Sequence, residues 1–275
     1  MTAVDRGRVT VAIIGAGKMG ETLLSGLLRA GWPTRDLMAT ARRAERGEEL
    51  AQRHGITVVD NAVAAERADV IVLAVKPQDM VALMTSLGSQ VPPGKLVVSI
   101  AAGIPTAFLE RHLPAGTPVV RVMTNTPALV DQAMSAISPG AHAGPDDLEL
   151  TERMLRPLGK TIRVPEAQQD AVTALSGSGP AYFYYLVEAM TDAGILLGLP
   201  RAVAHDLIVQ SAIGSAVMLR DSGEHPVRLR EAVTSPAGTT ISAIRELENH
   251  RVRAAFLSAL EAARDRAREL AAGLE

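Results

Sequence analysis

The sequence predicts two parts: a doubly wound α/β sheet domain over residues 1–164 and an all-helical domain over residues 165–275. Two observations predict this division. Before Pro165, short β-branched runs alternate with helical stretches, as in sheets whose parallel strands are joined by crossover helices. After Pro165, apolar residues recur at three- and four-residue steps, which is typical of helices. A chain of 275 residues is long enough for two domains with sizeable cores.

The first part contains seven short runs in which β-branched and other apolar residues predominate. Parallel strands are buried on both faces, so near-continuous apolar runs of this kind predict a mostly parallel sheet with helices between its strands. In chain order the expected strands are "VTVAIIG", "DLMAT", "VIVLAV", "KLVVSIA", "PVVRVM", "AMSAIS" and "KTIRV".

The second part should consist of helices that follow a glycine-rich loop, "SGSGP". Two of its stretches, "AYFYYLVEAM" and "LIVQSAIGSAVML", are too apolar for helices with a single covered face. A helical domain that buries this surface by dimerising is the simplest solution. We expect Tyr182, Phe183, Tyr184 and Tyr185 in the core or in the dimer interface. The helices are expected at residues 182–197, 202–219, 241–247 and 252–270.

Composition and charge exclude several classes of function. With 28 basic and 30 acidic residues, the chain lacks the basic excess of a protein that binds nucleic acid or an anionic membrane surface. The absence of Cys excludes disulfides and thiolate nucleophiles. Residues 1–8 carry charges where a secretion signal needs apolar residues, and we expect no membrane-spanning run, so a cytoplasmic location is predicted. The six His residues lack metal-site spacing, so no metal is expected.

The segment "VAIIGAGKMG" places glycines at 15, 17 and 20 between an apolar strand and an expected helix, "ETLLSGLL". In this G-x-G-x-x-G spacing the first glycine makes a tight turn, the second lets the backbone approach a pyrophosphate, and the third lets helix and strand pack closely. The helix N-terminus attracts the phosphates. This context predicts a Rossmann-type dinucleotide site rather than a plain turn, and we assign to it Gly15, Gly17, Lys18, Met19 and Gly20.

The end of the second expected strand indicates which dinucleotide is bound. An NAD enzyme usually places an acidic residue about 20 residues after the glycines, on the ribose 2′-hydroxyl. This chain has Ala39 and Thr40 there, followed by Arg42 and Arg43. Guanidinium groups pair with a 2′-phosphate and a hydroxyl can bond to it, so NADPH is favoured, with NADH possible. Asp36 lies at the beginning of this strand and not at its end, so it does not make NAD the favoured cofactor. The alternative is that the two arginines only solvate the start of a helix.

Three further strand ends present candidate contacts, because ligands of open α/β sheets sit beyond the carboxyl ends of the strands. In "AVKPQ", Lys76 faces either the cofactor or solvent before a helix, and "SIAAG" is either a place for a flat ring or a simple turn. In "VMTNTPA", Asn125 has to be satisfied by backbone or by ligand, and both roles stay open. We assign Ala74, Lys76, Pro77 and Ala101, with Thr40 and Arg42, to the cofactor, and Asn125 to the substrate.

Five motifs resemble those of the pyrroline-5-carboxylate reductases, in the same order and over nearly the whole chain. They are "GAGKMG", "AVKPQ", "VMTNTPA", "ALSGSGPAYFYYLVEA" and "VTSPAGTTISAIRELE", of which the last is similar to the family's most diagnostic signature. The resemblance implies NADPH-dependent reduction of 1-pyrroline-5-carboxylate to proline, the last step of proline synthesis. It also implies an N-terminal Rossmann domain, a helical dimerisation domain and, commonly, a pentamer of dimers.

Two positions depart from the family's usual sequence. Thr124 stands where members usually have Pro, and Ala237 stands where they usually have Gly. Neither change removes a side chain that does chemistry. Ala237 raises a question about the backbone, because a positive φ at this position would disfavour a residue with a Cβ.

The segment Thr234–Thr240 is rich in hydroxyls but has no general acid. A cyclic imine is basic enough to arrive partly protonated, so the enzyme has mainly to position it. A helix expected to begin near Ser235 or Pro236 would attract the substrate carboxylate with its free N–H groups. The resemblance implies that Thr240 lies at the imine nitrogen; the alternative is that a Ser or Thr here is an ordinary N-cap. We assign Thr240 to catalysis and Ser235, Ala237, Gly238 and Thr239 to the substrate.

Other functions have different sequence requirements. A β-hydroxyacid dehydrogenase also joins a Rossmann domain to a helical one, but it uses a Lys early in the helical part, and no Lys follows Lys160 here. An imine reductase acting on another ring and a non-catalytic NADP-binding regulator both remain open. Turnover of NADPH with 1-pyrroline-5-carboxylate separates these possibilities.

Overall fold

The computed structural model describes residues 8–272, and the chain within it forms two compact units. The first unit runs as far as Ser178 and resumes at Ala263, while the second spans Gly179–Ala262. Residues 165–178, which the sequence places in the helical part, therefore pack with the sheet. The predicted domain boundary at residues 164 and 165 stays a prediction.

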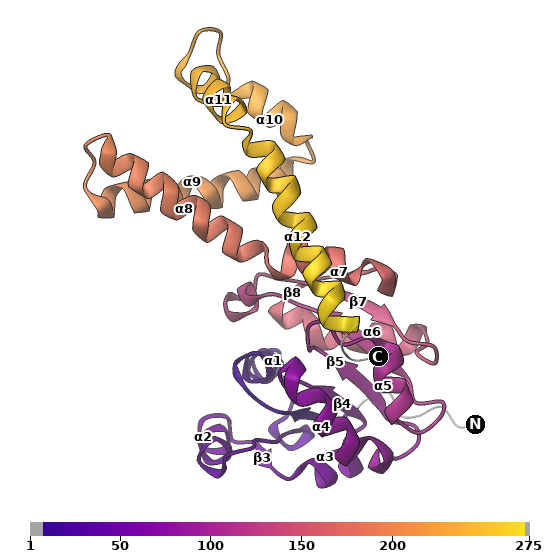
Figure 1. Ribbon diagram of the computed structural model, residues 1–275. Helices are drawn as coiled ribbons and strands as arrows, with labels where there is room; N and C mark the ends of the chain where they lie inside the picture. The colour runs from indigo at the N-terminus through magenta and orange to yellow at the C-terminus, as the bar shows by residue number, and fades with distance from the viewer. Residues whose placement is uncertain (1–7, 273–275) are drawn as a thin grey trace. The chain divides into compact units, whose positions relative to one another are not determined.

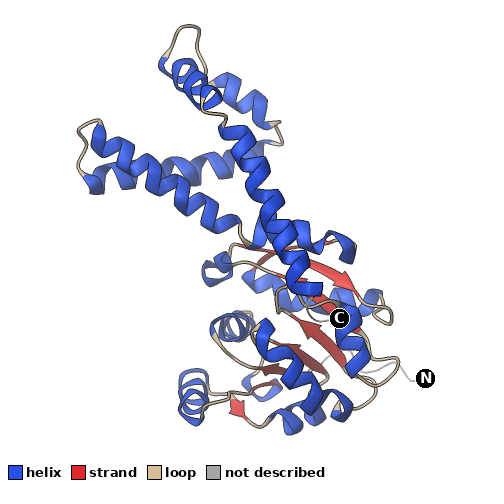
Figure 2. Ribbon diagram, in the orientation of Figure 1, coloured by secondary structure: helices blue, strands red, loops and turns tan. Residues whose placement is uncertain are grey.

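The first unit is built on one eight-stranded sheet, which confirms the predicted α/β fold (Figure 2). The strand order is β3-β2-β1-β4-β5-β6-β7-β8, and every neighbouring pair is parallel except β6 and β7. The order reverses at β1, which lies between β2 and β4, and this is where open sheets of this kind bind ligands. The strands are β1 (Val11–Ile14), β2 (Leu37–Ala39), β3 (Thr57–Val58), β4 (Val70–Leu73), β5 (Leu96–Ser99), β6 (Val119–Met123), β7 (Ala133–Pro139) and β8 (Gly159–Arg163).

Helices cover both faces of this sheet. Successive side chains of each strand point to opposite faces, so each strand contributes to the core on both sides. Val11 and Ile13 of β1 pack with α1, α2 and α6, whereas Ala12 and Ile14 pack with α3, α4 and α5. All four of these β1 residues are fully or almost fully buried. The helices are α1 (Lys18–Arg29), α2 (Ala44–His54), α3 (Asn61–Arg67), α4 (Pro77–Leu87), α5 (Thr106–His112), α6 (Pro145–Leu155) and α7 (Gln169–Val172).

The second unit is all helical, as the periodicity predicts (Figure 1). Its first two helices, α8 and α9, pack against each other as a hairpin closed at Gly198, whose φ is 94°. Their contact is close at Gly194, where an added Cβ would lie 2.7 Å from the Cβ of Ala204. The helices are α8 (Gly179–Leu196), α9 (Arg201–Ser222), α10 (Pro226–Ala232), α11 (Thr239–Asn249) and α12 (Val252–Ala272), the last of which ends in the first unit.

Large apolar side chains of the second unit are exposed in the single chain. Phe183, Tyr184 and Tyr185 are 63%, 65% and 75% exposed, so they are not core residues of one chain. The expectation that no segment is long and apolar enough to span a membrane is wrong for α9, a helix of 22 residues that contains an 18-residue stretch with a mean hydropathy of 1.5. One such helix is weak evidence for a membrane, and the same exposed surface suits burial against a second copy of the chain.

Candidate functional site

The glycine loop between β1 and α1 has the geometry that each glycine predicts. Gly15 has a φ of 79°, and a Cβ there would collide with the side chain of Val75. Gly17 is exposed, and among residues 8–272 the nearest atom to its missing Cβ is the carbonyl oxygen of Gly15 at 3.9 Å. A Cβ on Gly20 would lie 3.1 Å from side-chain carbons of both Ile13 and Ala74. The loop is thus tightly turned, open at Gly17 and closely packed at Gly20.

The start of α1 lies directly after this opening. Gly17 is the N-cap and Lys18 the first helical residue, and both are exposed, whereas Met19 packs partly against the core. The first N–H groups of a helix lack intrahelical acceptors and carry the positive end of the helix dipole. A phosphate group placed at Gly17 would meet these donors without steric obstruction from a Cβ.

Thr40 is turned toward the glycine loop. It follows β2, is 4% exposed, and its hydroxyl oxygen accepts a hydrogen bond from the Gly15 N–H at 3.1 Å. Its main-chain oxygen accepts from the Ala16 N–H at 3.0 Å. Thr40 therefore supports the loop directly, a role that the sequence did not indicate.

Arg42 and Arg43 lie at the start of α2 with exposed side chains. The Arg42 guanidinium is 3.7 Å from a carboxylate oxygen of Asp79, and the Arg42 side chain is 88% exposed. It is therefore accessible to a phosphate. Asp36 lies before β2, as expected, and pairs with Arg8 at 2.6 Å.

A charged cluster that the sequence analysis did not identify connects α1 with α2. Glu21, in α1, accepts hydrogen bonds from Arg46, from Arg53 at 2.7 Å and from His54 at 3.0 Å. Burial alone would raise the pKa of Glu21, but the hydrogen bonds from these three side chains outweigh it and lower the pKa to about 2. Glu21 is therefore ionised near neutral pH, and it lies near the start of α1, the helix that follows the glycine loop.

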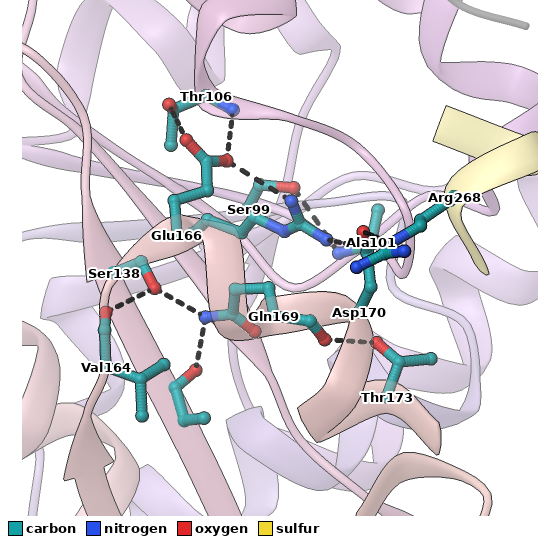
Figure 3. Close-up of polar contacts among 12 residues, drawn as sticks. Ser99, Ala101, Thr106, Ser138, Val164, Glu166, Gln169, Asp170, Thr173 and Arg268 are labelled. Carbon is teal, nitrogen blue, oxygen red and sulfur yellow. Dashed lines mark hydrogen bonds and ion pairs between the residues drawn. The ribbon is translucent and has the colours of Figure 1, made fainter. Parts of the chain in front are cut away.

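The ends of β4 and β5 carry the other candidate cofactor contacts. Ala74 packs against Gly20, Lys76 is the exposed N-cap of α4, and Pro77 is its first residue. Ala101 is buried, and its N–H donates to the Ser99 hydroxyl at 3.4 Å (Figure 3). These residues line the carboxyl edge of neighbouring strands, the position from which contacts to a bound dinucleotide are made.

The connection between β5 and α5 is fixed by a carboxylate from beyond β8 (Figure 3). Glu166 accepts hydrogen bonds from the N–H of Thr106, at 2.8 Å, and from its hydroxyl, and so caps α5 in place of the N-cap residue Pro105. The buried Arg121 pairs with Glu166 at 3.2 Å and lies 3.7 Å from Asp170. Asp170 is also 3.9 Å from Arg268 near the end of α12. Asp170 and Arg268 belong to the two segments of the first unit that lead to and from the second unit. Both segments therefore contact the first unit's sheet region at this one cluster.

Asn125 lies at the end of β6, where both ends of its side-chain amide are bonded. Its nitrogen donates to the carbonyl oxygen of Ser176 at 3.2 Å, and its oxygen accepts from the Met134 N–H at 3.2 Å. Ser176 belongs to a π-helical turn, Thr173–Gly177. This arrangement favours the structural role that the sequence left open beside substrate contact.

The hydroxyl-rich loop of the second unit lies between α10 and α11. Ala237 has a φ of 56°, in the left-handed region that disfavours a residue with a Cβ. Gly238 is the N-cap of α11 and donates its N–H to the carbonyl oxygen of Ser235 at 3.1 Å. The predicted helix start near Ser235 or Pro236 is therefore wrong: a turn intervenes, and α11 begins at Thr239.

Because α11 begins at Thr239, the first free N–H groups of this helix belong to Thr239 and Thr240. Thr239 and Thr240 are the first two helical residues, with Thr239 exposed and Thr240 half-buried. The N-cap is a glycine, so the alternative in which a Ser or Thr side chain caps the helix does not apply. Gly238 lies close to Ser235, since an added Cβ would collide with the Ser235 hydroxyl. The loop thus brings Ser235, Gly238 and the α11 N-terminus together.

Curated proteins match nearly the whole chain. It is 45% identical to a pyrroline-5-carboxylate reductase of Corynebacterium melassecola over 265 residues, which cover 95% of this chain and 98% of the relative. A pyrroline-5-carboxylate reductase of Methanosarcina acetivorans is 43% identical over 94% of this chain and 97% of its own length. The chain belongs to the pyrroline-5-carboxylate reductase family. The family model "Pyrroline-5-carboxylate reductase dimerisation" matches residues 166–270, and "NADP oxidoreductase coenzyme F420-dependent" matches residues 10–103.

Solved structures agree with this membership. A pyrroline-5-carboxylate reductase from Coxiella burnetii is 35% identical and superimposes with a TM-score of 0.87, covering 96% of this chain and 99% of that one. The Plasmodium falciparum pyrroline carboxylate reductase, solved with NADP bound, is 26% identical with a TM-score of 0.86, covering 96% and 98%. Recognition of the family from its motifs is confirmed, and so is its enzyme class, an oxidoreductase.

Within residues 8–272, no group of three or more His, Asp or Glu side chains is placed to hold a metal ion. Two of the isolated His residues make hydrogen bonds: His54 is bonded to Glu21, and His225 caps α10 by accepting from the N–H of Val227 at 3.3 Å. Thr124, where the reductase family usually has Pro, accepts a hydrogen bond from the Ser135 hydroxyl at 2.9 Å.

Proposed function

We propose that this protein reduces 1-pyrroline-5-carboxylate to L-proline with NADPH, the last step of proline biosynthesis. In this reaction a hydride adds to the imine carbon and the nitrogen carries a proton, so the C=N bond becomes an amine. The observation that carries the proposal is the 45% identity to a reductase of this name over 95% of the chain. The loop before α11 supports it, because it offers hydroxyls and helix N–H groups but no acid, which suits a substrate that arrives protonated.

The residues of the glycine loop fit a bound dinucleotide. The space at Gly17 and the free N–H groups at the start of α1 suit a pyrophosphate, and the exposed Arg42 suits a 2′-phosphate. When bound, NADPH supplies the hydride. NADH is the weaker alternative, since the residues directly after β2 are Thr40 and Ala41 and neither is an acid. We propose that the cofactor contacts are made by Gly15, Gly17, Lys18, Met19, Gly20, Thr40, Arg42, Ala74, Lys76, Pro77 and Ala101.

The substrate is held, in this proposal, by the loop before α11. The N–H groups of Thr239 and Thr240 and the hydroxyl of Ser235 bind the carboxylate, and the missing side chain of Gly238 lets Ser235 lie close to the helix start. The Thr240 hydroxyl bonds to the imine nitrogen and orients it. Ala237 holds the turn that presents these groups, and Asn125 is the remaining candidate from the first unit, through contact or through its bond to Ser176.

We further propose that the protein self-associates through its helical part, as a dimer and, in larger assemblies, as a pentamer of dimers. The match of residues 166–270 to a dimerisation family and the exposed aromatic side chains of α8 support the dimer. Dimerisation is also the reason to prefer a cytoplasmic protein over a membrane-bound one, since a second copy would cover the apolar face of α9.

The proposal is tested by turnover with the purified full-length chain. NADPH and 1-pyrroline-5-carboxylate are mixed, the nicotinamide absorbance is followed, and L-proline is identified by chiral chromatography. 1-Pyrroline, which lacks the carboxylate, is the matched control and is expected to react far more slowly. Equal turnover of both imines would favour a broader imine reductase. Tight NADPH binding without turnover of either imine would favour a regulator, and both results contradict the proposal.

A further inference from the structure

Glu21 is surrounded by three basic side chains from a single helix. Arg46, Arg53 and His54 of α2 all donate to its carboxylate, the latter two at 2.7 and 3.0 Å. The Glu21 and Arg46 side chains are only 18% and 20% exposed, whereas Arg53 is 59% exposed. Arg46 and His54, whose side chain is 12% exposed, are therefore the largely buried partners of this carboxylate, and Arg53 is the outer one.

Arg46 also contacts the glycine loop itself. Its guanidinium donates to the main-chain oxygen of Ala16 at 3.4 Å, and Ala16 lies between Gly15 and Gly17. The Ala16 N–H is held at 3.0 Å by the main-chain oxygen of Thr40. Both sides of the Ala16 residue are thus attached to the segment that runs from β2 into α2.

The charge of Glu21 matters because of its place in the helix. It follows the first helical residue, Lys18, by three positions, which is about 4.5 Å along the axis at 1.5 Å per residue. The proposed pyrophosphate would bind at this N-terminus. An uncompensated carboxylate one turn away would repel the anion, and its pKa of about 2 keeps it ionised at every pH at which the enzyme would act.

We propose that Arg46 is a positioning residue for the cofactor diphosphate: it neutralises Glu21 and holds the Ala16 carbonyl, and so keeps the α1 N-terminus competent to bind an anion. The inference rests on the proposed dinucleotide site and adds to it a residue that touches the loop rather than the ligand. Through the loop, Arg46 affects the binding of the diphosphate, which NADPH and NADH share. Its loss therefore weakens both cofactors in the same proportion, in contrast to a residue that contacts the 2′-phosphate.

The test measures dissociation constants of NADPH and NADH for the full-length protein by nicotinamide fluorescence. We expect Arg46→Met to raise both constants about tenfold or more, in equal proportion. Arg53→Met is the matched control, because it removes a cation from the same carboxylate without touching the loop, and it should change either constant by less than about threefold. Arg46→Lys, which keeps the charge, should weaken both cofactors less than Arg46→Met does.

A double variant isolates the role of charge. Glu21→Gln combined with Arg46→Met removes the anion together with its partner, and it should recover a large part of the lost affinity. A loss confined to NADPH would show instead that Arg46 contacts the 2′-phosphate, and unchanged constants in Arg46→Met would show that it has no role; either result overturns the inference while the proposed reaction stands. Failure of the wild-type chain to bind any dinucleotide would overturn both together.

Discussion

The side-chain nitrogen of Asn125 donates a hydrogen bond to the main-chain oxygen of Ser176, 3.2 Å away, and so attaches the end of β6 to the π-helical turn before α8. The same nitrogen lies 3.3 Å from the Ser176 hydroxyl. π-Helical turns are rare and occur frequently at functional sites. This turn packs closely on the strand end, since a Cβ on Gly177 would collide with Met123.

We expect Asn125→Ala to lower the free energy of unfolding by about 0.5–1.5 kcal/mol, because the exposed N–H of Met134 and the partly buried Ser176 carbonyl both lose their side-chain partner. Turnover should fall along with stability. Gln132→Ala, on the exposed surface nearby, should change neither. Urea unfolding and steady-state kinetics measure both quantities. A variant with a raised KM and an unchanged unfolding midpoint would show that Asn125 contacts the substrate directly.

Replacing Ala237 with Gly tests the strain in the substrate loop. At a φ of 56°, Ala pays a steric cost that Gly does not, so Ala237→Gly should raise the free energy of unfolding by about 0.5–1 kcal/mol. The matched control is Ala243→Gly, an exposed position inside α11, which should lower it by a similar amount. Thermal melts at fixed protein concentration compare the three proteins. Destabilisation by both glycines would contradict the left-handed conformation of Ala237.

Two variants of Thr240 test the role of its hydroxyl, one that removes the hydroxyl and keeps the size and one that keeps the hydroxyl. Thr240→Val keeps the size but loses the hydrogen bond to the imine nitrogen, so turnover should fall about tenfold or more, roughly 1.4 kcal/mol. Thr240→Ser keeps the hydroxyl and should remain largely active. Thr234→Val removes a hydroxyl that donates to the Arg230 carbonyl at 2.6 Å, within the preceding helical turn, and should leave turnover unchanged. A fully active Thr240→Val variant would refute the assignment.

Arg42 is expected to discriminate between the cofactors. Arg42→Met should raise the dissociation constant of NADPH about tenfold and leave that of NADH unchanged, because only NADPH carries the 2′-phosphate. Asp79→Asn should have the opposite effect, since Asp79 lies 3.7 Å from the guanidinium and competes for it. Both constants are measured by fluorescence titration. Equal weakening of the two cofactors by Arg42→Met would contradict a phosphate contact.

The strands and most helices could be predicted because their patterns are local. All seven expected runs form strands, whereas β3, only Thr57 and Val58, is too short to show a period. The helix α10 is seven residues with charges throughout, and it was missed for the same reason. The start of α11 was misplaced because Pro236 suggested a first helical residue, while the chain uses it in a turn with Ala237 in the left-handed region.

The charged cluster on α1 could not be predicted in the same way. Glu21 is separated from Arg46, Arg53 and His54 by 25, 32 and 33 residues, and only the packing of α1 beside α2 brings them together. The isolated His residues gave no signal, because a hydrogen-bonded His and a surface His have the same sequence pattern. The glycines did reveal their roles, since a tight turn and a close approach each exclude a side chain at one known position.

The stability of the protein should depend on Glu21 in acid. Its folded-state pKa of about 2 lies below its ordinary value of 4.5, so its stabilising effect is fully present above about pH 4.5 and is lost as the pH falls toward 2. Glu21→Gln should therefore be less stable than the wild type at pH 7, by on the order of 2–3 kcal/mol. This difference should shrink steadily between pH 4.5 and pH 2.

Urea unfolding at fixed protein concentration, from pH 7 to pH 2, measures this dependence. Glu48→Gln is the matched control, because it removes the same charge from the exposed side of α2 and should follow the wild-type curve closely. A Glu21→Gln curve that runs parallel to the wild type through this pH range would mean that the three basic side chains do not stabilise the carboxylate. In that case neutralisation of Glu21 by Arg46 would lose its physical basis, whereas the hydrogen bond from Arg46 to Ala16 would remain.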